Sequence, residues 1–279
     1  MTAQRGGKGG NVRIPFGREG AVEVNGGAVQ EYTAETRDLL FGGSLVLCQD
    51  RKGYRFSIDA VLLAGLTRVK TKDRVMELGT GCGVVLLAFA AHNLGAHWEG
   101  VEIQPRLAFL AQKNVDANGL AGRVFIHTMD WKDVPRIFPA QGFDLVVSNP
   151  PYRRPFSGRI NPDGQKAAAR HELRGSIRDM FASAAHLLGH GGRCAVIYPA
   201  SRLDDSMVAA LEAGFRPKRL TLIHSHAKAP ATLVHLECVK GAGQELRVAP
   251  PFFIYDEHGR YTAAMMRLHE GLLHAASHD

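Results

Sequence analysis

The sequence predicts an α/β protein with a doubly wound, mostly parallel sheet of seven strands, an antiparallel strand at the sheet edge, and a small N-terminal hairpin and helix extension. From residue 73 onward, short apolar runs of strand length alternate with segments of helical length. Strands that alternate with helices form parallel sheets with helices on both faces. The last two apolar runs have no helix between them, so they should pair antiparallel at one edge.

The expected elements follow in chain order. Residues 44–48 and 54–56 lie on either side of a polar stretch and predict a hairpin. Asp59 is then placed to cap a short apolar helix over residues 60–66. The expected strands cover residues 74–78, 98–102, 123–127, 143–148, 193–198, 219–224 and 232–239. The expected helices cover residues 84–92, 105–118, 177–188 and 201–213.

Glycine content and charge divide the chain into three predicted parts. Residues 1–30 are basic and glycine-rich, which predicts a disordered arm. Residues 31–70 hold the hairpin and the first helix, and residues 71–270 form the main, catalytic domain. The net charge is +7, and seven basic residues face two acids between residues 152 and 178. A polyanion such as nucleic acid is therefore a suitable partner.

Composition excludes several other classes. With 45% hydrophobic and 22% charged residues, the chain is neither collagen-like, nor a coiled coil, nor wholly disordered. Apolar stretches such as residues 84–91 are shorter than the ~18 residues that cross a bilayer, and no signal segment opens the chain. We therefore expect a cytoplasmic protein without membrane contact. The four cysteines and 13 histidines lack ligand spacing, so we expect reduced thiols and no metal.

The most informative segment is Glu77-x-Gly79-x-Gly81-x-Gly83, a strand that runs into three alternate glycines and then a helix. Glycines let the backbone turn sharply and approach a ligand closely. A dinucleotide fingerprint would place glycine or alanine where Val84 stands, which disfavours a pyrophosphate cofactor. The carboxylate of Glu77 would repel a diphosphate and attract a cation.

Acidic residues follow the next two strands. Glu102 ends one of them and is placed to accept hydrogen bonds from ribose hydroxyls. Asp130, after the other, is placed to accept from an exocyclic amine, and Ile103 or Trp131 would cover an adenine face. Together these residues predict a pocket for a phosphate-free adenosine that carries a positive group, a description that S-adenosylmethionine fits.

The fourth expected strand ends in Asn149-Pro150-Pro151-Tyr152. The consecutive prolines make this turn rigid and remove two backbone donors. The side-chain carbonyl of Asn149 and the backbone carbonyl of Pro150 can accept the two hydrogens of an amide-type NH2 group that lies on the ring of Tyr152. This arrangement aims the nitrogen lone pair at a sulfonium methyl group.

These motifs resemble the class I S-adenosylmethionine-dependent methyltransferases that act on planar amino nitrogens. Residues 53–59 and 161–172 further resemble the bacterial tRNA(valine)-type adenine-N6 methyltransferase group, and the similarity extends from residue 33 to residue 270. The resemblance implies a Rossmann-like fold, S-adenosylmethionine as cofactor with S-adenosylhomocysteine as product, and methylation of adenine N6 in RNA, with tRNA as the favoured partner.

The resemblance also implies roles for individual residues. The catalytic set would be Asn149, Pro150 and Tyr152. The cofactor set would be Glu77, Gly79, Gly81, Gly83, Glu102, Ile103, Asp130, Trp131 and Asn149. The substrate set would be Phe56 and Asp59 in the pocket, with Arg153, Arg154, Arg159, Lys166 and Arg170 near the phosphates of a splayed-out base.

Three alternatives use the same fold. A protein-glutamine N5-methyltransferase of the release-factor type resembles a user of the same turn, but the first seventy residues leave little room for its helical substrate domain. A guanine-N2 methyltransferase of ribosomal RNA usually has a longer or duplicated chain. An RNA-binding module without catalysis would show a broken turn or missing acids, whereas this sequence retains them.

Overall fold

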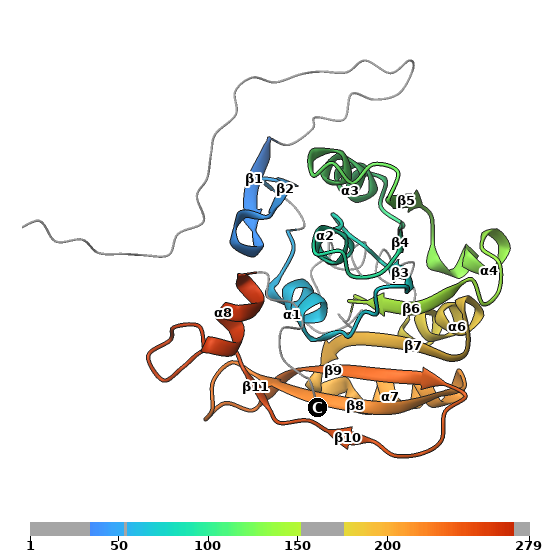
Figure 1. The fold of residues 1–279 in the computed structure, drawn as a ribbon. Helices are drawn as coiled ribbons and strands as arrows, with labels where there is room; N and C mark the ends of the chain where they lie inside the picture. Colours follow the sequence, from blue (N-terminus) through green and yellow to red (C-terminus); the bar gives the residue numbers. More distant parts are fainter. Residues whose placement is uncertain (1–33, 53–54, 152–175, 271–279) are drawn as a thin grey trace, which may run out of the picture.

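The computed structural model describes residues 34–52, 55–151 and 176–270. The chain folds around one sheet, with helices on both of its faces and a separate two-stranded hairpin beside α2 and α3 (Figure 1).

The strands of the main sheet lie in the order β10-β8-β9-β7-β6-β3-β4-β5, with β11 paired to β8. Their bounds are β3 (Arg74–Leu78), β4 (His97–Glu102), β5 (Val124–Thr128), β6 (Phe143–Ser148), β7 (Leu188–Pro199), β8 (Phe215–His224), β9 (Ala231–Lys240), β10 (Arg247–Val248) and β11 (Phe252–Phe253). Pairs from β5 to β7 are parallel, whereas β9 is antiparallel to both β7 and β8. The predicted mostly parallel, doubly wound sheet is confirmed.

The helices are α1 (Ile58–Leu66), α2 (Val84–Ala91), α3 (Pro105–Ala117), α4 (Val134–Ile137), α6 (Ile177–Leu187), α7 (Leu203–Glu212) and α8 (Ala263–His269). Short 3-10 turns are η1 (Phe41–Gly43), η2 (Trp131–Asp133) and η3 (Ala200–Arg202). The expected helices agree with these bounds to within a few residues, although the last one begins with η3 before it continues as α7.

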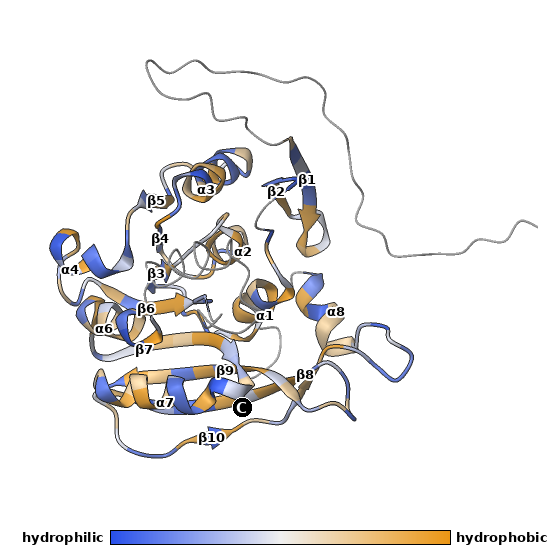
Figure 2. Cartoon of the chain, turned by 180° about the vertical axis from the view of Figure 1, so that it is seen from behind, coloured by the Kyte–Doolittle hydropathy of each residue, from blue (hydrophilic) through white to orange (hydrophobic). Residues whose placement is uncertain are grey.

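Side-chain alternation along β6 divides the core into two layers. Leu145 and Val147 pack with α1 and α2 on one face, and Val146 packs with α6 and α7 on the other. In Figure 2, β6 and β7 are largely apolar, whereas α3, α6 and α7 carry both apolar and hydrophilic residues. Burial on both faces explains the continuous apolar runs of the parallel strands.

The predicted hairpin was wrong in its partner. β2 (Leu45–Asp50) pairs with β1 (Glu35–Leu40), which precedes it, and the described residues 55 and 56 of the expected second strand are not in a strand. Two glycines with positive φ in η1 make the tight connection. The segment after β2 is instead attached by side chains, since Gln49 accepts a hydrogen bond from the backbone N–H of Phe56 at 2.9 Å.

Two further expectations need correction. The N-cap of α1 is Ser57, whose hydroxyl accepts from the backbone N–H of Asp59 at 3.3 Å, so Asp59 lies in the first turn. At the sheet edge, β8 and β9 are antiparallel as expected, but β10 and β11 add to β8 and extend the sheet.

The cysteines of this chain are free thiols, and three of the four are buried. Within the described ranges, no helix combines the length and apolar character that crossing a membrane requires.

Candidate active site

The carboxyl ends of β3 and β6 bring the two principal motifs together. Glu77 is the register partner of Val147, so the glycine loop after β3 and the turn after β6 leave the sheet at the same edge. Glu77, Gly79 and Asn149 line one recess, which we call the acceptor recess. Its other lining residues are Phe56, Ala60, Thr80, Cys82, Val84 and Val85.

The acceptor recess measures about 20 Å³. This volume accommodates a group about the size of a water molecule, but not a nucleoside. Its lining combines the buried carboxyl group of Glu77 with the amide of Asn149 and the aromatic ring of Phe56. The recess therefore offers polar contacts to a small chemical group next to an apolar wall.

Glycine is required at two positions of the loop. Gly79 has φ of +80°, and a Cβ atom there would lie 3.1 Å from Cζ3 of Trp131. Gly83 has φ of +91° and forms the N-cap of α2. The backbone N–H groups of Gly79 and Thr80 both donate to the carbonyl of Val101, at 2.9 and 3.0 Å. These bonds attach the loop to β4.

Glu77 is buried, with 2% of its surface exposed. Desolvation raises the pKa of its carboxyl group to about 8, against the opposing effect of two hydrogen-bond donors. These donors are the hydroxyl of Thr80, at 2.6 Å, and the backbone N–H of Leu86 in the first turn of α2. A bound cation would favour the ionised form of this carboxyl group.

Glu102 holds the glycine loop from the neighbouring strand. Its Oε2 accepts from the backbone N–H of Gly81 at 3.0 Å, and its Oε1 accepts from the backbone N–H of Gln104 at 2.9 Å. Oε1 also accepts from Nε2 of Gln104 at 3.3 Å. Each carboxylate oxygen has about two lone-pair sites, so Oε2 is the oxygen that can accept a further hydrogen bond. The side chain is buried and fixed before any ligand binds.

The residues after β4 and β5 differ in accessibility. Ile103 is 37% exposed, whereas Trp131 is 6% exposed and packs beneath Gly79. Asp130 caps η2 by accepting from the backbone N–H of Lys132 at 2.9 Å, and the Lys132 ammonium lies 3.3 Å from its other oxygen. Of the two apolar residues predicted near an adenine, Ile103 is the accessible one.

The turn after β6 is held in place by Ser148. The hydroxyl of this fully buried residue donates to the carbonyl of Leu78 at 2.7 Å, which connects the ends of β6 and β3. Asn149 is half-buried, Pro150 is buried and Pro151 is exposed. The amide of Asn149 therefore borders the acceptor recess from a rigid support.

Sequence reasoning missed Asn114, which braces the site from α3. Its Nδ2 donates to the carbonyls of Cys48 and Cys82, each at 3.0 Å, and its Oδ1 accepts from the backbone N–H of Cys48 at 2.6 Å. One buried amide thus joins β2, α3 and the glycine loop. The available signal was that Asn114 directly precedes Val115 and follows Ala111 by three residues, which places this polar side chain on the apolar face of α3.

The predicted substrate residues divide into two groups. Phe56 lines the acceptor recess, and Asp59 lies buried in the first turn of α1. The remaining predictions lie outside the described residues, namely Tyr152, Arg153, Arg154, Arg159, Lys166 and Arg170. In the described ranges, no group of three His, Cys, Asp or Glu side chains is placed to hold a metal ion.

The relatives of this chain include tRNA1(Val) (adenine(37)-N6)-methyltransferases. The protein from Porphyromonas gingivalis (strain ATCC BAA-308 / W83) is 34% identical over 152 residues, which cover 54% of this chain and 59% of the relative. The protein from Bacteroides fragilis (strain YCH46) is 28% identical over 194 residues, which cover 68% and 80%. The chain therefore spans 59% of the length of the Porphyromonas relative.

Solved structures share the fold. A predicted O-methyltransferase, Atu636 from Agrobacterium tumefaciens, superposes with a TM-score of 0.64 at 21% identity, covering 79% of this chain and 100% of that protein. TYW2 from M. jannaschii in complex with AdoMet gives a TM-score of 0.51 at 13% identity, covering 75% and 87%. The family model of the methyltransferase small domain matches residues 57–217, more than half of the 279 residues. The chain belongs to the methyltransferase small domain family.

Proposed function

We propose that this protein is an S-adenosylmethionine-dependent methyltransferase that methylates the exocyclic N6 amino group of an adenine in tRNA. The observation that carries the proposal is the acceptor recess, which Glu77 and Asn149 both line at the carboxyl edge of the sheet. The named activity of the Porphyromonas and Bacteroides relatives supports the choice of tRNA adenine.

The residues around the glycine loop fit the cofactor. Glu77 offers a buried carboxyl group that lacks a cationic partner among its described neighbours, which suits a ligand with a positive charge. Glu102 would accept from the ribose hydroxyls, Asp130 from the adenine amine, and Ile103 would cover the adenine face. Gly79, Gly81 and Gly83 would allow close backbone approach. When bound, S-adenosylmethionine supplies a methyl group activated by a positively charged sulfur.

The residues at the turn would hold the acceptor amine. The side-chain carbonyl of Asn149 and the backbone carbonyl of Pro150 each accept one hydrogen of a planar NH2 group. These contacts favour a more pyramidal nitrogen, because they withdraw the lone pair from conjugation with the base, and they fix its direction. Ser148 preserves this geometry through its bond to β3.

Further residues complete the proposed substrate site. Phe56 would contact the target base from the apolar wall of the recess, and the predicted ring of Tyr152 would stack on it. The basic residues predicted from the sequence, of which Arg153 and Arg154 are the first, would contact the flanking phosphates. Trp131 would support the cofactor loop from below rather than touch the adenine, since it is buried under Gly79.

The decisive experiment is transfer of a labelled methyl group from the cofactor to separate tRNA, ribosomal RNA and protein fractions, followed by nucleoside digestion. We expect N6-methyladenosine in the tRNA fraction. Label confined to protein would establish the release-factor type of activity instead, and label on guanine would reassign the acceptor base. Binding of cofactor without transfer to any fraction would indicate a catalytically inactive RNA-binding module.

A further inference from the structure

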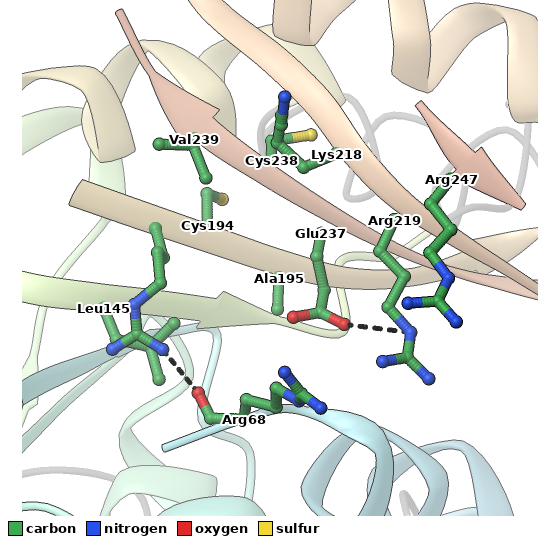
Figure 3. Close-up of a pocket in the computed structure, with 11 residues that line it drawn as sticks. Arg68, Leu145, Cys194, Ala195, Lys218, Arg219, Glu237, Cys238, Val239 and Arg247 are labelled. Atoms are coloured by element: carbon green, nitrogen blue, oxygen red, sulfur yellow. Dashed lines mark hydrogen bonds and ion pairs between the residues drawn. The ribbon is translucent and has the colours of Figure 1, made fainter. Parts of the chain in front are cut away.

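A second recess lies toward the opposite end of the same strands (Figure 3). It encloses about 230 Å³, and its walls come from β6 to β10 and from the segment after α1. One lining residue, Leu145, pairs with Arg193 near the start of β6, whereas Asn149 follows the end of that strand. We call it the basic recess, because its lining holds the cations Arg68, Arg193, Lys218, Arg219 and Arg247 against the single acid Glu237.

Strand register places its central side chains in one row. Arg247 of β10 pairs with Arg219 of β8, which pairs with Glu237 of β9, which pairs with Ala195 of β7. Register partners on adjacent strands point to the same face and stand about 5 Å apart. Arg68 faces this row from the segment after α1 (Figure 3).

The negative charge near the basic recess does not balance the positive charge of its lining. Arg193 is paired with Asp73, but the Nε of Arg219 is 3.7 Å from Oε1 of Glu237. That oxygen is buried and forms no hydrogen bond within the described structure. Arg247 is exposed and has no ion pair with a described acid. Positive charge is therefore left at the mouth of the recess.

Basic residues continue beyond the recess along the loop that leads from α1 to β3. Lys70, Lys72 and Arg74 are exposed there, next in sequence to Arg68. A small anion would need only the recess, whereas a row of separate cations suits a chain of phosphates. The four residue steps from Leu145 in β6 to Asn149 just after it span about 13 Å, roughly the rise of four stacked nucleotides.

We propose that the basic recess binds a backbone phosphate of the RNA substrate, as a docking contact separate from the acceptor recess. Arginine suits this task because its planar guanidinium can donate two parallel hydrogen bonds to one phosphate. The contact would position the RNA and carry no base specificity. This inference rests on the proposed tRNA substrate, but it concerns a different end of the sheet.

The test measures binding of a tRNA transcript by the full chain as a function of salt. Replacing the half-buried Arg219 and the exposed Arg247 together, Arg219→Ala with Arg247→Ala, should weaken binding about tenfold near physiological salt and lower the salt slope by roughly 1 to 2. Glu237→Gln should act in the opposite direction and tighten binding about twofold, because it removes the opposing carboxylate and releases Arg219. The turnover number at saturating tRNA should be unchanged in both variants.

The matched control is Arg136→Ala on α4, which removes an exposed arginine of the same charge that does not line the basic recess. It should leave both the affinity and the salt slope at their wild-type values, so that the smaller effect of Glu237→Gln is measured against it. If the double variant unfolds, the Glu237→Gln variant still tests the inference, since tighter RNA binding has no origin in lost stability.

The outcomes separate the two proposals. If the wild type methylates tRNA but the variants keep its affinity and salt slope, the docking contact is rejected and the proposed function stands. If inorganic phosphate raises the melting temperature of the wild type but not of the double variant, while RNA affinity is unchanged, the recess is a site for a free anion and the RNA inference is overturned. If the wild type neither binds nor methylates tRNA, both proposals fail together.

Discussion

The two ends of the sheet present opposite chemistry. At the carboxyl edge, acids such as Glu77 and Glu102 are buried around a loop of glycines, and the polar contacts are short and fixed. At the amino edge, long basic side chains such as Arg219 and Arg247 surround a wider recess. One sheet therefore carries a narrow, fixed, acidic site at one end and a wider, basic recess at the other.

The largest expected effect isolates the acceptor turn. Asn149→Ala should reduce the turnover number ~100-fold or more, because the amine loses an oriented acceptor, while cofactor binding stays nearly intact. Single-turnover kinetics and calorimetric titration of the cofactor measure the two quantities. The control is Gln112→Ala, which removes an exposed amide from α3. Near-normal turnover of Asn149→Ala would remove this turn from catalysis.

A second prediction concerns the rigidity of the carboxyl edge. Gly79→Ala should lower the free energy of unfolding by about 2 kcal/mol, because alanine disfavours positive φ and its Cβ would crowd Trp131. Gly119→Ala is the matched control, since its φ is +66° but a Cβ there meets open space. Urea unfolding should show a loss of only about 1 kcal/mol for the control. Equal losses would show that contact with Trp131 does not matter.

The third prediction concerns the charge of Glu77. With a folded pKa of about 8 and an ordinary value of 4.5, the folded state retains a proton that the unfolded state has released. The free energy of unfolding of the wild type should therefore fall as pH rises from about 5 to 8, by the linkage of protons to folding. Glu77→Gln should lack this contribution, as chemical denaturation across that range will reveal.

The same variant tests ligand recognition. A cation favours ionised Glu77, so affinity for S-adenosylmethionine should rise as pH rises through about 8. Glu77→Gln should bind about tenfold more weakly and lose this dependence. The neutral product S-adenosylhomocysteine serves as control, because it lacks the sulfonium charge. Identical pH profiles for the two proteins would assign the dependence to another group.

The smallest expected effect concerns stability at the amino edge of the sheet. Asp73 pairs with Arg193 and accepts from the backbone N–H of Lys70 at 2.6 Å. Asp73→Asn keeps an acceptor but loses the charge, so it should destabilise the fold by about 1 kcal/mol. Cofactor affinity should not change, because this residue directly precedes β3 and lies at the end of the strand opposite the glycine loop. A change in that affinity would show that the two edges are energetically coupled.

The sequence predicted the sheet well because burial on both faces leaves a strong signal. The runs that became β3 and β6 are apolar, and the glycines and prolines after them mark where the strands end. The site followed from the same signal, since parallel strands deliver their carboxyl ends to one edge. The placement of Glu77, Gly79 and Asn149 at one edge of the sheet was therefore predictable from the sequence alone.

The hairpin was mispredicted because its first strand violates simple alternation. Asp38 in β1 is buried, which a pattern of apolar residues does not anticipate. Its carboxylate accepts from Gln49 at 2.9 Å and from Arg55 at 2.7 Å, and this network compensates for burial. Gln49 and Arg55 are 11 and 17 residues from Asp38 in the sequence, and folding brings their side chains to its carboxylate.

Other features leave no distinctive pattern in the sequence. Ser57 and Asp59 are both good N-cap residues, so composition alone does not decide between them. β10 and β11 have two residues each, too few to show a period. The basic recess was not predicted, because its cations come from four separate segments that only strand register unites.

The amide of Asn114 connects the N-terminal hairpin to the glycine loop by hydrogen bonds. Because one side chain of α3 bonds both Cys48 in β2 and Cys82 in the loop, a displacement of this amide would release β2 and the loop together. Ligand that orders the loop should therefore slow hydrogen exchange at the Cys48 amide, far along the chain from the atoms it touches.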